Sequence, residues 1–144
     1  MLDGKDVSED IRTVEVTNNT FYVARTPGVR NIMVDWQRKI AGLKGVVAEG
    51  RDIGTVVFPN ADYKFYLDAD IEERSNRRYK ELVEKGKTID AKKLLAELKE
   101  RDEKDSSRKV GPLKKADDAV LIDTTNFTVD QTVEKLLKVI NRGK

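Results

Sequence analysis

Residues 63–86 read YKFYLDADIEERSNRRYKELVEKG and contain the pattern that decides the fold. The first part, from Tyr63 to Ala69, is rich in aromatic and aliphatic residues and predicts a β-strand. Asp70 and Glu73 form the Asp-x-x-Glu arrangement that satisfies free amides at a helix start, and Gly86 suits a helix end. We therefore predict a strand followed by a helix from Ile71 to Lys85.

The same alternation of strand and helix continues toward the C-terminus. A second helix is predicted to open near Asp90, and Ala119 to Asp123 predicts a buried strand. Thr128 and Gln131 have the spacing of a capping box for a last helix. The apolar residues expected to face inward on that helix are Val133, Leu136, Leu137 and Ile140. Strands that alternate with helices indicate an α/β fold, in which helices flank a parallel sheet.

The N-terminal part of the chain has a weaker pattern. Val14 and Val16 alternate with polar residues after the turn dipeptide Asp3-Gly4, which predicts small antiparallel strands. Apolar residues at helical spacing then predict an amphipathic helix from Val29 to Leu43. The short apolar run from Val46 to Ala48 predicts a further strand, which leads into a loop flanked by glycines.

Composition excludes several classes of site. A chain of 144 residues fits one compact unit with at most a minor appendage. Without cysteine or histidine there is no disulfide, thiolate nucleophile or imidazole base, so any chemistry depends on Arg, Lys, Asp and Glu. The net charge of +2 argues against a protein that coats nucleic acid. No stretch approaches the roughly 20 apolar residues of a membrane span, and we expect a cytoplasmic protein.

The loop from Gly50 to Gly54 is the first candidate site. It follows a predicted strand, and ligand crevices of open α/β sheets lie beyond the carboxyl ends of strands. Arg51 offers a planar fork of donors for phosphate, and Asp52 offers a carboxylate that accepts from an amino group. A plain turn with a surface ion pair accounts for these residues equally well.

One face of a predicted helix carries leucines first and charged residues further along the chain. Its members, spaced by four, three, four and three residues, are Leu94, Leu98, Arg101, Asp105 and Arg108. This spacing puts them on one helix face. Residues 99–115 carry seven basic and four acidic side chains, a local excess of three positive charges that suits nucleotide phosphate. The alternative to phosphate binding is a solvated helix end, on which these side chains form ion pairs with one another. The same two interpretations apply to Arg74, Arg77 and Arg78.

Four segments and the closing helix together resemble the bacterial cytidylate kinases, the CMP and dCMP kinases of the nucleoside monophosphate kinase family. The segments are DGKDVSEDIRT (3–13), TPGVR (26–30), GRDIGTVVFPNADYKFYLDADIEERSNRR (50–78) and LLAELKERDEKDSSRKVGPLKKADDAVLIDTT (94–125). They occur in order over essentially the whole chain. GRDIGTVVFP together with RDEKDSSR is specific to that family.

The resemblance implies a P-loop-kinase-like fold and transfer of the γ-phosphoryl group of ATP to CMP or dCMP, with Mg²⁺ bound alongside ATP. Asp52 would accept from the cytosine amino group, and Arg30 would donate to the other polar edge of the base. Arg51 and Arg108 would hold the CMP phosphate, while Arg101 and Asp105 would bind the ribose. The residues that would act catalytically on the phosphates are Arg101 and Arg108. The residues that would reach ATP from the lid are Arg77 and Arg78.

The resemblance also implies a division of the chain. Residues 1–28 would be the remainder of a small CMP-binding insert with β structure, and residues 29–144 the kinase core, with a lid-like segment at about 74–110. No membrane or nucleic-acid partner and no metal ligand within the chain are expected, and the complete protein would be a monomer. Phe21 stands where the family usually has a serine that contacts cytosine, which leaves the fine base preference open.

The 144 residues contain no Gly-rich P-loop. Gly86-Lys87-Thr88 lacks the glycine five positions earlier and follows a predicted helix, whereas a P-loop follows a strand. Met1 lies where the family's CMP-binding insert is already under way, so the sheet is expected to be incomplete. We expect a C-terminal kinase portion that is inactive alone. The alternatives are half of a split kinase, a non-catalytic CMP-binding module and an RNA-binding fragment that uses residues 99–115.

Overall fold

The computed structural model describes residues 1–24, 26–42 and 45–143, and within the helix that follows Thr13 the side chains of residues 14, 17, 18 and 21 lie outside the description. Phe21 is therefore not placed. The chain forms two compact units, Met1–Val47 and Ala48–Lys144. The sequence predicted a different boundary, after residue 28, between the remainder of the family's insert and the kinase core. That boundary stays a prediction.

The first unit is helical. It contains a short 3₁₀ turn η1 (Asp10–Arg12), helix α1 (Val14–Ala24) and helix α2 (Pro27–Ala41). The predicted strands around Val14 were wrong. The Thr13 hydroxyl accepts from the Val16 amide at the start of α1, and this local hydrogen bond favours a helix over the strand that the alternation predicted.

Two other features of this unit agree with the sequence. The only antiparallel pairing among the described residues is a single bridge between Leu2 and Lys5, around the Asp3-Gly4 turn. Helix α2 begins at Pro27, whose fixed φ suits a first helical position. It confirms the predicted amphipathic helix, although Leu43 lies outside the described residues.

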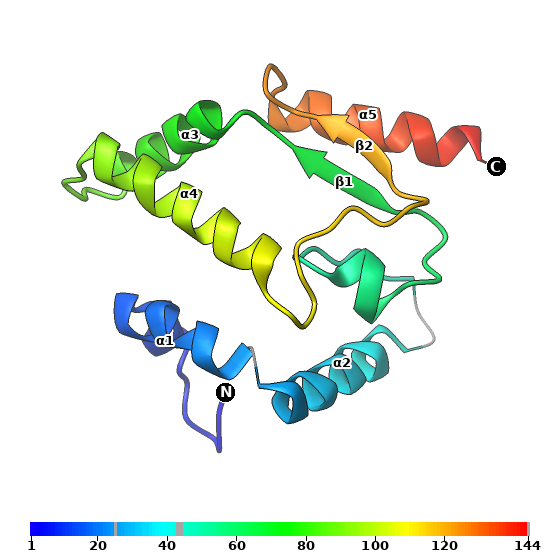
Figure 1. Ribbon diagram of the computed structural model, residues 1–144, viewed down its shortest axis with the longest axis horizontal. Helices are drawn as coiled ribbons and strands as arrows, with labels where there is room; N and C mark the ends of the chain where they lie inside the picture. The colour runs from blue at the N-terminus through cyan, green and yellow to red at the C-terminus, as the bar shows by residue number, and fades with distance from the viewer. Residues whose placement is uncertain (25, 43–44, 144) are drawn as a thin grey trace. The chain divides into compact units, whose positions relative to one another are not determined.

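The second unit is built on a parallel pair of strands. β1 (Phe65–Asp68) pairs with β2 (Val120–Asp123), with Phe65 opposite Val120 and Asp68 opposite Asp123. Helices α3 (Ile71–Glu84) and α4 (Ala91–Ser107) pack against each other, and α5 (Val129–Arg142) follows β2 (Figure 1). The predicted α/β architecture with a parallel sheet and flanking helices is confirmed.

The strand predicted from Val46 to Ala48, where the first unit ends and the second begins, was wrong. Residues 45–49 have no regular structure, and the chain continues into a single π-helical turn, η2 (Ile53–Val57). A strand is stable only when it pairs with a neighbour, and the described sheet contains only β1 and β2. The short apolar run near Val47 has no strand beside it in the described part of the chain.

The core of the second unit is small. Apolar side chains that are buried among the described residues are Val57, Ala69, Leu82, Leu94 and Ile122. The strand predicted to be buried therefore has only Ile122 inside, and Leu121 is half exposed. On α5, Leu136 and Ile140 are partly buried as predicted, whereas Val133 and Leu137 are about half exposed, contrary to the prediction.

The helix ends follow the sequence signals closely. Asp70 accepts from the amides of Glu72 and Glu73 at the start of α3, and Asp90 does the same for the first turn of α4. Thr128 and Gln131 form the complete capping box of α5. Gly86 follows α3 with a φ of +73°, a conformation that favours glycine.

We predict that Asp70→Ala lowers the free energy of unfolding by about 1 kcal/mol, because two amides of α3 lose their acceptor. Urea denaturation followed by circular dichroism measures this change. Asp62→Ala, at an exposed position outside the helices, is the matched control and should change stability by less than about 0.5 kcal/mol. Equal effects of the two variants would contradict the assignment of the cap.

Candidate functional site

Three arginines surround the carboxylate of Asp105, which is largely buried. Arg51 donates from Nε to Oδ2 at 2.8 Å, and Arg108 Nη1 lies 3.6 Å from Oδ1. Arg101 Nε stands 4.0 Å from Oδ2. One negative charge therefore faces three positive charges, and this cluster has a positive excess that an anion can neutralise.

The chain leaves α4 within this cluster. Arg101 and Asp105 lie one turn apart on α4, and Arg108 is its C-cap with extended backbone. The chain then folds back, since the Leu113 amide donates to the carbonyl of Asp105 at 2.7 Å. The stripe that the sequence predicted therefore ends at a bend, which keeps the Arg108 side chain against the helix and 13% exposed.

Arg108 keeps one unused buried donor. Its Nε has no hydrogen-bond partner among the described residues, although that atom is shielded from solvent. A buried donor without an acceptor costs about 1 to 3 kcal/mol. An acceptor such as a phosphate oxygen would remove this cost, so the cluster is suited to bind one.

The glycine-flanked loop brings Arg51 to the same place. Asp52 begins η2, and its carbonyl accepts from the amides of Val56 and Val57. A Cβ at Gly50 would stand 2.9 Å from the Ile53 side chain, so the absence of a side chain at Gly50 lets the loop close. The structure thus brings Arg51 to Asp105 on α4, which is 54 residues further along the chain. Asp52 directly follows Arg51.

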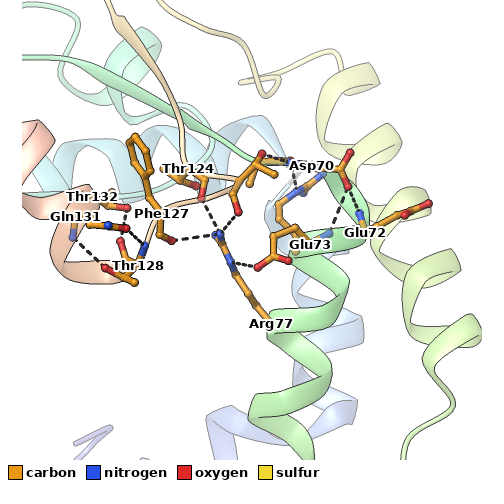
Figure 2. Close-up of polar contacts among 12 residues, drawn as sticks. Asp70, Glu72, Glu73, Arg77, Thr124, Phe127, Thr128, Gln131 and Thr132 are labelled. Atoms are coloured by element: carbon orange, nitrogen blue, oxygen red, sulfur yellow. Dashed lines mark hydrogen bonds and ion pairs between the residues drawn. The ribbon is translucent and has the colours of Figure 1, made fainter.

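Arg77 contacts the turn that follows β2. Figure 2 shows its guanidinium reaching from α3 to backbone carbonyls at that turn. Nη2 donates to the carbonyls of Thr124 at 2.7 Å, Thr125 at 3.0 Å and Phe127 at 3.5 Å, and Nε pairs with Glu73 at 2.9 Å. Arg77 therefore links α3 to the carboxyl end of β2 and the start of α5.

Arg78 has a different environment on the same helix. Its Nη1 pairs with Glu81 Oε2 at 2.6 Å, and its side chain is about half exposed. Lys85 and Arg78 together lower the pKa of the Glu81 carboxyl to about 2, with the Lys85 hydrogen bond as the larger cause. The two arginines that the sequence grouped together are thus distinct: Arg77 is bonded to backbone, while Arg78 is in a surface ion pair.

Arg74 and Lys64 make contacts that no sequence pattern predicted. Arg74 pairs with Asp102 at 2.7 Å and donates to the carbonyl of Ala69, so it joins α3, α4 and the end of β1. The hydrogen bond to Asp102 raises the pKa of Arg74. Lys64, inside the β-rich run, pairs with Asp118 and donates to the carbonyl of Pro59, and a lysine between aromatic residues has no distinguishing sequence pattern. Only the folded structure shows that the Lys64 side chain also lies against Gly54, at the end of the site loop.

Arg30 is the remaining predicted site residue. Arg30 lies on α2 in the first unit, whereas the Asp105 cluster belongs to the second unit. Within the described residues, no group of three or more acidic side chains could hold a metal ion, and Asp105 is already paired with arginine. None of the described helices is long and apolar enough to cross a bilayer.

Comparison with known proteins now decides the family. The sequence model of the family described as "Cytidylate kinase" matches residues 1–142. The chain belongs to the cytidylate kinase family. The resemblance drawn from the motifs is thereby confirmed, and the Asp105 cluster is a feature of a cytidylate kinase chain.

Curated cytidylate kinases align with the whole chain. The protein from Desulforamulus reducens is 49% identical over 100% of this chain and 65% of its own length. Those from Pediococcus pentosaceus and Clostridioides difficile are 45% and 49% identical over 99% and 97% of this chain, and 63% and 65% of their own lengths. The chain therefore spans less than two thirds of the length of these cytidylate kinases.

We predict that Arg77→Lys lowers the free energy of unfolding by about 1 kcal/mol, because an ammonium group cannot reproduce the bonds from Nε and Nη2 together. Arg78→Lys is the matched control, since a surface ion pair contributes between about 0 and 1 kcal/mol and lysine can keep it. Urea denaturation measures both variants. A larger loss for Arg78→Lys than for Arg77→Lys would contradict the structural role of Arg77.

Proposed function

We propose that this chain carries the CMP-binding side of a cytidylate kinase, which transfers a phosphoryl group from ATP to CMP or dCMP and yields ADP with CDP or dCDP. The observation that carries the proposal is the cluster of three arginines around Asp105, one of which, Arg51, directly precedes Asp52 in the chain. Phosphoryl transfer depends on positioning and on charge stabilisation, which arginines supply without cysteine or histidine.

The phosphate of CMP would bind to Arg51 and Arg108. Among the described residues Arg51 is bonded to Asp105 only through Nε, so its terminal nitrogens remain available as donors. Arg108 offers the buried Nε. Asp105 holds the two guanidinium groups in place by charge and keeps their mutual repulsion low. Arg101, which is more exposed, would help with phosphate and act with Arg108 in the transfer step.

The nucleoside would lie beside the phosphate. Asp105 and Arg101 are proposed to contact the ribose, which fits their position on one face of α4. Asp52 is proposed to accept from the cytosine amino group, and Arg30 to donate to the other edge of the base. A carboxylate discriminates cytosine from uracil because cytosine presents an amino donor where uracil presents a carbonyl.

The ATP side is proposed to involve α3. Arg78 is the better placed to reach phosphates, because its ion pair with Glu81 is exposed and exchanges readily. Arg77 could contribute Nη1, which has no hydrogen bond to the described residues, while Nη2 stays on the backbone. Magnesium would arrive as part of the ATP substrate, with its ligands mostly outside these residues. We expect a cytoplasmic protein that is monomeric when complete.

We predict that Arg108→Met weakens CMP binding by about 10- to 100-fold, because hydrogen bonds to charged groups contribute about 1.5 to 3 kcal/mol. Cytidine lacks the phosphate, so its affinity should change by less than about twofold. Isothermal titration of the purified chain measures both ligands. Arg142→Met, at the exposed end of α5, is the control. Equal weakening of CMP and cytidine would remove Arg108 from the phosphate site.

We predict that the 144-residue chain alone forms no CDP from ATP and CMP. The β- and γ-phosphates must be held by backbone amides and a lysine of a P-loop, and no such motif occurs in these residues. Addition of a P-loop segment from a related cytidylate kinase should restore turnover. Substantial turnover by the chain alone would show another route to ATP binding and would contradict this division of roles.

The second candidate is a CMP-binding module without catalysis, or half of a split kinase. It rests on the same cluster together with the absence of a P-loop from the 144 residues. CMP binding without turnover, even after a P-loop segment has been added, would favour the binding module.

A further inference from the structure

Arg74 joins the end of β1 to α4. Its Nε donates to the carbonyl of Ala69, directly after β1, at 3.0 Å, and its Nη2 pairs with Asp102 Oδ2 at 2.7 Å. Arg74 itself lies near the start of α3, the helix that packs beside α4 (Figure 1). One guanidinium group therefore connects β1, α3 and α4 at the carboxyl end of the strand.

The second half of α4 is anchored by carboxylates. In residues 99–107, all of which the structure describes, only Asp102 and Asp105 are not exposed, and both are in ion pairs. The fully buried leucine of this helix, Leu94, lies in its first turn. Apolar packing thus holds the beginning of α4, whereas ion pairs hold the half that carries the candidate site.

The two carboxylates have different partners. Asp105 pairs with the arginines of the candidate site, whereas Asp102 pairs with Arg74 on α3. Asp102 directly follows Arg101 and lies three residues before Asp105, so all three side chains belong to one turn of a hydrogen-bonded helix. A contact that fixes Asp102 therefore also restricts where the neighbouring site residues stand.

Arg74 also balances the charge of Asp102. The hydrogen bond to Asp102 is the largest cause of the raised pKa of Arg74, and the carboxylates of Asp68 and Asp70 raise it further. Loss of Arg74 would leave the Asp102 carboxylate without this cation. Because Asp102 is next to Arg101 in the chain, its carboxylate would then compete with an arriving phosphate for positive charge.

We propose that Arg74 is a positioning residue for the phosphate of CMP, because through Asp102 it holds the half of α4 that carries the arginine cluster around Asp105. This inference rests on the proposed function, since it requires the CMP phosphate to bind at that cluster. Arg74 does not contact the phosphate. It acts through the placement of the arginines that do.

Two single substitutions separate positioning from charge. Arg74→Lys keeps the positive charge but cannot reproduce the bonds from Nε and Nη2 together. Asp102→Ala removes a negative charge close to the cluster. If charge alone mattered, Arg74→Lys would leave CMP affinity unchanged and Asp102→Ala would raise it, since a carboxylate repels a phosphate. Positioning predicts that each variant weakens CMP binding by about three- to tenfold, as isothermal titration of the purified chain would measure.

Glu97→Ala is the matched control. Glu97 is also an ion-paired carboxylate of α4, but its partner, Lys93, lies on the same helix. Its loss should change CMP affinity by less than about twofold. The double variant Arg74→Lys/Asp102→Ala should weaken binding no more than the stronger single variant does, because both substitutions break one contact.

A second measurement detects the placement of the arginines without ligand. In the ¹⁵N-labelled chain, the Nε–Hε resonances of Arg51 and Arg108 should shift in Arg74→Lys and in Asp102→Ala and stay unchanged in Glu97→Ala. Asp102 is partly exposed and alanine favours a helix, so Asp102→Ala should fold. A role in stability alone would change neither these resonances nor the CMP affinity of the folded chain.

The outcomes separate the two claims. Unchanged or tighter CMP binding in either single variant, or an equal weakening in Glu97→Ala, would overturn the role of Arg74 and leave the proposed function standing. Failure of the unsubstituted chain to bind CMP would overturn the proposed function, and the role of Arg74 with it.

Discussion

The Asp105 carboxylate holds together the site on which the rest of the account depends. Without it, three guanidinium groups would repel one another in a partly buried space, and their positions would not be fixed. With it, Arg51 from the loop and Arg108 from the end of α4 converge within hydrogen-bond or ion-pair distance of one side chain. The cluster keeps a positive excess and a buried donor at Arg108 Nε. Both features suit an arriving phosphate.

The surrounding elements converge on the carboxyl ends of the two strands. Arg74 donates to the carbonyl of Ala69, just after β1, and Arg77 donates to carbonyls just after β2. The Asp70 amide donates to the Thr125 hydroxyl between the two strand ends. In open α/β sheets this edge is where ligands bind. Arg74 and Arg77 thus connect the start of α3 to that edge. For both residues the sequence had also allowed a solvated position on the helix surface.

Local signals were predicted well because the responsible atoms are close in sequence. The caps at Asp70, Asp90 and Thr128 each involve a side chain and amides two or three residues later. The same locality explains one error: the Thr13 hydroxyl begins α1 where the alternation of Val14 and Val16 favoured a strand. Local capping outweighed a short alternating pattern.

Features that depend on distant partners could not be predicted in the same way. The strand expected near Val47 needed a neighbouring strand, and Val133 and Leu137 needed a covering surface that the described residues do not supply. Arg77 meets carbonyls about 50 residues away, and a sequence pattern does not reveal such a contact. The structure does bring together Arg51, Asp105 and Arg108, which the resemblance had assigned to the CMP site.

We propose that the arginines around Asp105 form the phosphate site, whereas Arg77 is bonded to backbone carbonyls. The most direct measurement is an NMR titration that follows the Nε–Hε resonances of the arginines in the ¹⁵N-labelled chain as CMP is added. We expect the resonances of Arg51 and Arg108 to shift with CMP and with inorganic phosphate, and the resonance of Arg77 to stay unchanged. Equal shifts at all arginines, or shifts at Arg77 alone, would contradict it.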